Sequence, residues 1–119
     1  MLSPIPALAI RAYTATTALG RGRAAQAQAL EERRSGLRRN DFGPDPLDCW
    51  IGRVDGLEDA PLPDPLASWE SRNNRLAWLA LQQDGLREAV ADAVSRHGAA
   101  RVALVLGTST SSIGETEAA

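Results

Sequence analysis

The stretch RVALVLGTSTSSIGETEAA, residues 101–119, decides how the chain is interpreted. Residues 102–106 are apolar at every position, which predicts a strand that is covered on both faces. Gly107 and a run of small hydroxyl residues follow, and α/β proteins often bind ligands with such a loop at the carboxyl end of a strand. The loop LGTSTSSIG contains no acid, base or metal ligand of its own. Taken alone, the stretch could be a binding loop or simply a loop.

The first half of the chain predicts one long strand and one helix. Residues 5–12 begin as an apolar run and predict a buried strand. Residues 22–33 are rich in Ala, Gln and Glu and predict a helix, with Gly36 as its left-handed C′ residue. Prolines and aspartates between residues 37 and 71 predict irregular connecting structure. Within it, residues 49–54 are the one candidate for a short strand.

A long helix is predicted over residues 72–96. Its apolar residues recur at helical spacing and mark one buried face: Leu76, Leu79, Leu86, Val90, Ala93 and Val94. Gly85 lies inside this helix at a cost of about 1 kcal/mol relative to Ala, which predicts a close packing contact there. His97 is expected in the last turn, with Gly98 as the cap.

The order strand, helix, irregular segment, helix, strand predicts an α/β fold. Two or three strands are too few to cover two helices, and so small a sheet would have exposed edges. The chain is therefore expected to be an incomplete piece of a larger fold.

Composition and charge exclude several classes of function. The chain has 119 residues, 44% hydrophobic and 24% charged, as expected for one folded soluble domain. A net charge of -2 gives no attraction toward nucleic acid or an anionic membrane surface. No apolar stretch approaches the ~18 to 20 residues of a membrane span, and the N-terminus lacks the basic segment of a signal peptide. A cytoplasmic protein with no membrane span is expected.

The segment GRGRAA, residues 20–25, matches the dinucleotide-binding pattern and opens a helix. That chemistry requires the glycines directly after a strand, whereas here the polar stretch YTATTAL intervenes. The pattern therefore favours a turn and helix start over a nucleotide site.

The single cysteine and single histidine provide neither a disulfide nor a metal site, and no cofactor is expected. Cys49 would need a nearby base to act as a nucleophile, so a partly buried structural thiol is favoured. His97 is interpreted as a helix-end residue. The arginine pairs at residues 33–34 and 38–39 favour a solvated helix end, with an acidic carrier protein as the alternative. The three tryptophans are interpreted as packing anchors.

Taken together, five segments resemble the N-terminal part of the β-ketoacyl synthases that act on acyl carrier protein (ACP), condensing enzymes of the thiolase-like fold. The segments, in chain order, are AIRAYTATTALGRG at 9–22, EERRSGL at 31–37, CWIGRVDG at 49–56, RNNRLAWLAL at 72–81 and RVALVLGTSTSS at 101–112. They span nearly the whole chain in the family's order and spacing. The resemblance implies that residues 1–119 are the N-terminal portion of a layered α-β-α fold with a mixed sheet.

The resemblance implies decarboxylative Claisen condensation of acyl and malonyl thioesters in fatty acid or polyketide and polyene biosynthesis. ACP would be the partner, and the full-length protein would form a homodimer or a heterodimer with another synthase. The family's nucleophilic cysteine and two histidines lie in motifs beyond residue 119, so no catalytic residue is assigned. The chain alone is expected to be inactive and poorly soluble.

One set of residues is carried over from the family. The loop after Gly107 lies, in the family, near the acyl pocket and the dimer contact, which assigns this role to Ser109, Thr110, Ser111 and Ser112. Thr110 matches the position that influences chain length. The family usually has glycines there, and hydroxyls suggest a less purely aliphatic acyl chain.

Two other interpretations remain open. The chain could be a small non-catalytic module that binds an ACP or a synthase partner. It could also, with less support, be a nucleotide-binding domain that uses Gly20 and Gly22.

Overall fold

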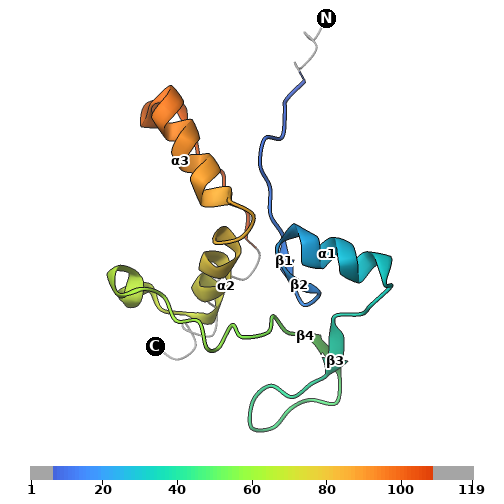
Figure 1. Cartoon of the computed structure of the whole chain (residues 1–119). Coiled ribbons are helices and arrows are strands. Elements are labelled where there is room, and N and C mark those ends of the chain that lie inside the picture. Colours follow the sequence, from blue (N-terminus) through green and yellow to red (C-terminus); the bar gives the residue numbers. More distant parts are fainter. Residues whose placement is uncertain (1–6, 109–119) are drawn as a thin grey trace, which may run out of the picture.

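Small antiparallel hairpins alternate with helices along residues 7–108, which are the residues that the computed structural model describes. Figure 1 shows the elements in chain order: β1 (Thr16–Thr17), β2 (Gly20–Arg21), α1 (Gly22–Glu31), β3 (Leu37–Arg39), β4 (Trp50–Gly52), the 3-10 helix η1 (Asp64–Trp69), α2 (Arg72–Leu81), α3 (Leu86–His97) and the 3-10 turn η2 (Ala99–Arg101). The described residues are therefore of mixed α/β class, as the sequence predicts.

The β1–β2 hairpin leads directly into α1. Thr17 pairs with Gly20 across the turn, and α1 begins at Gly22. Gly20 has a φ of 143°, and a Cβ at this position would lie 2.6 Å from the Cβ of Ala25. Only glycine therefore allows the hairpin to pack this tightly on the first turn of the helix.

The predicted helix over residues 22–33 is confirmed, but it ends at Glu31. Arg33, with a φ of 52°, takes the left-handed conformation that was predicted for Gly36. Gly36 serves a different purpose: a Cβ there would lie 2.7 Å from the backbone of Ala18. The glycine is needed for close approach of two chain segments.

The predicted short strand is confirmed as β4, and it pairs with a strand that was not predicted. Leu37 lies opposite Gly52 and Arg39 lies opposite Trp50 in the antiparallel β3–β4 pair. A segment containing two adjacent arginines has no apolar pattern, so its pairing could not be recognised from the sequence.

The single helix predicted over residues 72–96 is wrong, because α2 and α3 are separate. The chain turns at Asp84 (φ 58°) and Gly85 (φ 69°), and Gly85 precedes the first turn of α3. Gly85 is therefore a turn residue and not a packing contact.

Ser71 begins α2 by accepting a hydrogen bond from the Asn74 N–H at 3.2 Å. Gly98 ends α3 as predicted.

The two predicted buried strands are also wrong over the described residues. Residues 7–12 and 102–107 have no ladder partner in the described part of the chain. Leu8 is 87% exposed and Val105 is 93% exposed, although the first strand was expected to be buried and the second to be covered on both faces. An apolar run favours burial, but a strand also needs a neighbouring strand that forms hydrogen bonds with its backbone N–H and C=O groups.

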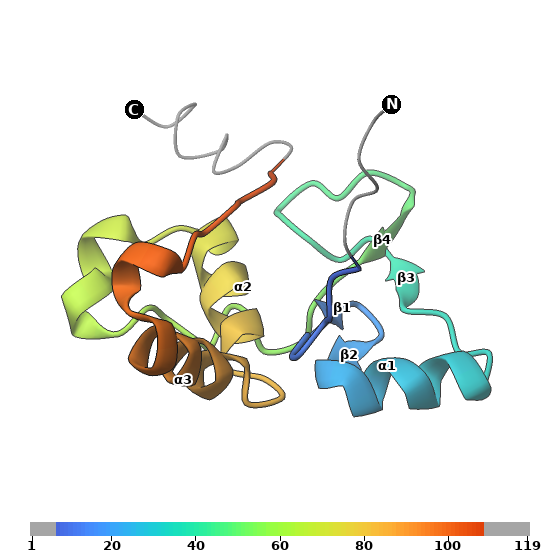
Figure 2. The same cartoon turned by 90° about the horizontal axis from the view of Figure 1, so that it is seen from above.

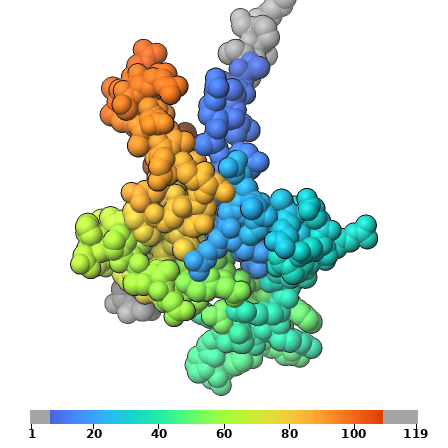
Figure 3. All heavy atoms as spheres, viewed as in Figure 1, coloured from blue at the N-terminus to red at the C-terminus, as the bar shows by residue number. Residues whose placement is uncertain are grey.

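The hydrophobic core is small and lies in the middle of the chain. Val54, Leu57 and Leu79 are buried, with Ala60 and Leu76 packed against them; we call these five residues the central cluster. By contrast α3, which projects away from α2, has no buried residue (Figures 1 and 3). The radius of gyration is 17.9 Å, against about 13 to 14 Å for a compact domain of this length. The chain is extended because its helices share little core.

Candidate functional site

The predicted acyl-pocket residues Ser109, Thr110, Ser111 and Ser112 lie outside the described residues. Residues 103–108, which lead to them, are exposed and belong to no helix or strand. A Cβ at Gly107 would meet no atom within 4 Å. Their role as pocket or dimer contact stays a prediction.

The glycine turn before α1 is occupied by a side chain from a distant part of the chain. Asp84 Oδ2 accepts hydrogen bonds from the Thr14 hydroxyl at 2.7 Å and from the Arg23 N–H at 2.9 Å. Arg23 Nε also lies 3.5 Å from Asp84 Oδ1. We call this group, Thr14, Arg23 and Asp84, the Asp84 clasp.

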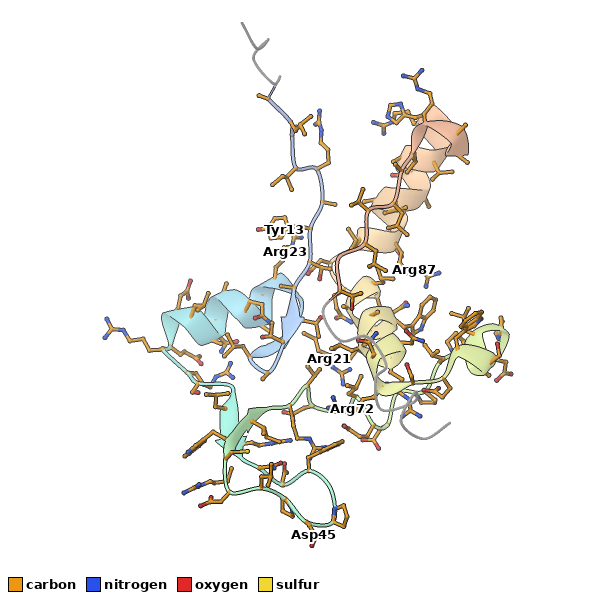
Figure 4. All side chains as sticks on the ribbon, turned by 180° about the vertical axis from the view of Figure 1, so that it is seen from behind. Tyr13, Arg21, Arg23, Asp45, Arg72 and Arg87 are labelled. Atoms are coloured by element: carbon orange, nitrogen blue, oxygen red, sulfur yellow. The ribbon has the colours of Figure 1, made fainter. Side chains whose placement is uncertain are left out.

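The clasp fixes both the charge of Asp84 and the conformation of its neighbours. The Thr14 hydroxyl, and then the Arg23 N–H, hold the pKa of Asp84 below its ordinary value. The Arg23 guanidinium also stacks 4.9 Å from the centre of the Tyr13 ring, and Figure 4 shows these two side chains together. Because a carboxylate already occupies the start of α1, a bound phosphate would have to displace it. The predicted turn and helix start is confirmed.

A cavity of about 360 Å³ lies where α2 begins, and we call it the Arg–Glu cavity. It is lined by Phe42, Leu57, Glu58, Glu70, Ser71, Arg72 and Arg75. Arg72 Nε lies 3.0 Å from Glu58 Oε1, and Arg75 Nε lies 2.5 Å from Glu70 Oε1. Arg53, from just after β4, reaches Glu58 at 3.4 Å and Asp41 at 3.1 Å.

The charges in the Arg–Glu cavity balance one another. Arg75, and then the Leu62 N–H, lower the pKa of Glu70. Burial alone would raise the pKa of Glu58, but hydrogen bonds from its own backbone N–H and from Arg72 bring it below the ordinary value. Both carboxylates are therefore held ionised by fixed arginines. Neither is available as a general acid at neutral pH. The network instead has a structural role, because the ion pairs of Arg53 and Glu58 join the loop after β3 to α2.

An apolar groove of about 310 Å³ runs between η1 and α2. We call it the tryptophan groove, and its lining is Leu62, Leu66, Trp69, Asn74, Ala77, Trp78 and Leu81. Asn74 is its one polar side chain, and its Nδ2 donates to the Trp69 carbonyl at 2.7 Å. Trp69 is 69% exposed and Trp50 is 60% exposed, so the prediction that they are packing anchors is wrong for both. The groove offers apolar contact area without acid or base.

The structure does not bring His97 to Cys49. Cys49 is partly buried, as predicted, in the connection that enters β4. His97 is the last residue of α3, also as predicted. Figure 2 shows β3 and β4 on the opposite side of the molecule from α3.

Most of the arginines in the predicted pairs contact carboxylates. Arg34 lies 3.3 Å from Glu32 and Arg38 lies 3.2 Å from Asp55, while Arg39 pairs with Asp48. Exposed ion pairs of this kind contribute little to stability.

Residues 7–108 contain neither a candidate metal site nor a helix able to span a membrane. No group of three or more His, Cys, Asp or Glu side chains is placed to hold a metal ion there. Within the same residues, no helix combines the length and the apolar character needed to cross a membrane. Comparisons with known proteins find no matching family model, no matching curated protein and no matching solved structure.

Proposed function

We propose that the chain is the N-terminal part of a β-ketoacyl synthase-like condensing enzyme with a thiolase-like fold. The observation that carries this proposal is the order and spacing of five sequence segments over residues 9–112. Three of these segments coincide with structural features: the glycine turn before α1, the short strand β4, and α2 with its arginines at the start.

The exposed apolar segments fit this proposal. In a layered α-β-α fold, residues 5–12 and 102–106 would be strands of the central sheet, and the remainder of the enzyme would supply their neighbours and cover the helices. A chain with only part of the sheet would be extended and poorly packed. The radius of gyration of 17.9 Å and the absence of buried residues from α3 agree with that expectation.

The reaction would be decarboxylative Claisen condensation. A cysteine nucleophile and two histidines, all beyond residue 119, would carry it out on an acyl chain delivered by ACP. The loop around Thr110 would shape the acyl pocket or the dimer contact, with its hydroxyls favouring a polyketide or polyene chain. Residues 1–119 alone would be inactive.

The test is to sequence the gene past codon 119 and to assay the complete product. Support requires a downstream cysteine elbow, two histidine motifs, and formation of 3-oxoacyl thioester from acyl-ACP and malonyl-ACP that is lost when the cysteine becomes alanine. A stop codon directly after Ala119, or a complete product without condensing activity, overturns the proposal. Strong preference for long saturated acyl chains would contradict only the assignment of the hydroxyl loop.

A second candidate is a non-catalytic module that binds an ACP or a synthase partner. The tryptophan groove favours it, because Trp69 lies exposed in an apolar groove and tryptophan is enriched among the residues that carry binding energy at interfaces. Trp69→Ala would then abolish partner binding, while Trp50→Ala, an equally large change outside the groove, would not. Equal binding by wild type and Trp69→Ala would contradict this candidate.

A further inference from the structure

The arginines divide into those with a partner and those without. Seven contact carboxylates: Arg23, Arg34, Arg38, Arg39, Arg53, Arg72 and Arg75. Arg21 and Arg87 hydrogen-bond to a carbonyl oxygen and to Gln82. The side chains of four make no ion pair or hydrogen bond over residues 7–108: Arg11, Arg33, Arg96 and Arg101. An arginine without a partner retains its full capacity to bind an anion.

Two of these four arginines line the same pocket. Arg11, from the N-terminal segment, and Arg96 and His97, from the end of α3, surround a pocket of about 440 Å³. Figure 3 shows the N-terminal segment (blue) beside α3 (orange). Ala89 and Ala93 form the rest of the lining together with one acid, Asp92. We call this the α3-end pocket.

The charge balance of this pocket differs from that of the Arg–Glu cavity. There, Arg72 and Arg75 face Glu58 and Glu70. In the α3-end pocket two guanidinium groups face Asp92 alone, and the His97 side chain lies beside them. The C-terminal end of α3 carries a partial negative charge, which stabilises cations in the last turn. This charge stabilises Arg96 there although no carboxylate pairs with it.

We propose that the α3-end pocket binds a phosphate group, held between Arg11 and Arg96 with His97 beside it. Guanidinium groups match the geometry of phosphate oxygens and bind them in pairs of hydrogen bonds. The volume of about 440 Å³ exceeds the size of a phosphate ion, and the alanines leave apolar space for the organic part of an ester. The inference is independent of the proposed condensing activity.

The test titrates the ¹⁵N-labelled chain with inorganic phosphate and with glycerol 3-phosphate, against sodium chloride at matched ionic strength. We expect saturable shifts of the Ala89, Ala93 and Arg96 amides with phosphate and not with chloride. Tighter binding of glycerol 3-phosphate identifies an ester as the ligand, whereas equal or weaker binding identifies free phosphate.

The variants use arginines that lie inside and outside the pocket. Arg96→Gln and Arg11→Gln each should weaken binding about tenfold, the loss expected for a charged hydrogen bond. Arg33→Gln removes the same charge from an exposed, unpaired arginine elsewhere and should leave binding unchanged. Because Arg11 lies outside any helix, its variant remains informative if Arg96→Gln disturbs α3, which circular dichroism would reveal. Shifts with chloride equal to those with phosphate, absence of saturation, or equal weakening by Arg33→Gln overturns the proposal.

Discussion

The central cluster and α3 show how differently two apolar surfaces of one chain can be used. Leu57 is fully buried, and it lines the Arg–Glu cavity together with the ion-paired side chains there. The apolar residues of α3 have the same helical spacing as those of α2, yet Val90 is 50% exposed and no residue of α3 is buried. Amphipathic spacing therefore provides a surface suited to burial, but only a second element can bury it.

The strongest test of this comparison is Leu57→Ala against Val90→Ala. Truncating a fully buried leucine costs about 2 to 5 kcal/mol, which is a large part of the stability of a small domain. We expect Leu57→Ala to abolish cooperative urea unfolding measured by tryptophan fluorescence. Val90→Ala should change stability by no more than about 0.5 kcal/mol. Equal effects of the two substitutions would show that α3 shares the core.

A smaller loss is expected when the Asp84 clasp is broken. Asp84→Asn keeps a residue that tolerates the left-handed φ of 58° but removes the charge that faces Arg23 and the start of α1. The melting temperature should fall by a few degrees. Asp59→Asn removes the same charge from an exposed carboxylate without an ion pair, and serves as the control. No difference between the two variants would refute the role of the clasp.

A still smaller loss of stability is expected when acid protonates the carboxylates of the Arg–Glu cavity. Glu58 and Glu70 have pKa values below their ordinary 4.5, so the folded state binds fewer protons than the unfolded state near that pH. Their contribution to stability is complete above pH 4.5 and is lost as the pH falls through the lowered values. Glu70→Gln should flatten this dependence in urea titrations between pH 7 and pH 3. An unchanged slope would contradict the assignment.

The smallest effect on stability is expected for Val105→Lys, because that side chain is 93% exposed. The substitution should instead reduce self-association, since a charge on an unpaired apolar segment opposes edge-to-edge pairing. Sedimentation velocity over a range of concentrations would measure this. The matched control is Ala100→Lys, in the exposed turn η2. If both variants self-associate as strongly as the wild type does, residues 102–107 are not the cause of self-association.

Local features of the fold were predictable and long-range ones were not. Helix α1, strand β4 and the Gly98 cap follow from composition and from the conformational freedom of glycine. The break between α2 and α3 was missed because Asp84 is a non-glycine residue at positive φ, held there by contacts with Thr14 and Arg23 that are remote in the sequence.

The candidate sites divide in the same way. The Arg–Glu cavity and the α3-end pocket each combine residues from distant segments, such as Phe42 with Arg72 or Arg11 with Arg96. No local pattern marks such a pair. The tryptophan groove carried a sequence signal, because Leu62, Leu66 and Trp69 recur at helical spacing before an amphipathic helix, but exposure could not be read from that spacing.

The Asp84 clasp also has a consequence for the order of events in folding. Its hydrogen bond to the Arg23 N–H joins residues separated by 61 positions, and that to Thr14 joins residues separated by 70. Closing so long a loop is slow compared with forming a hairpin or a helical turn. We therefore expect the clasp to form after the barrier to folding, so that Asp84→Asn accelerates unfolding in stopped-flow experiments and leaves the refolding rate unchanged.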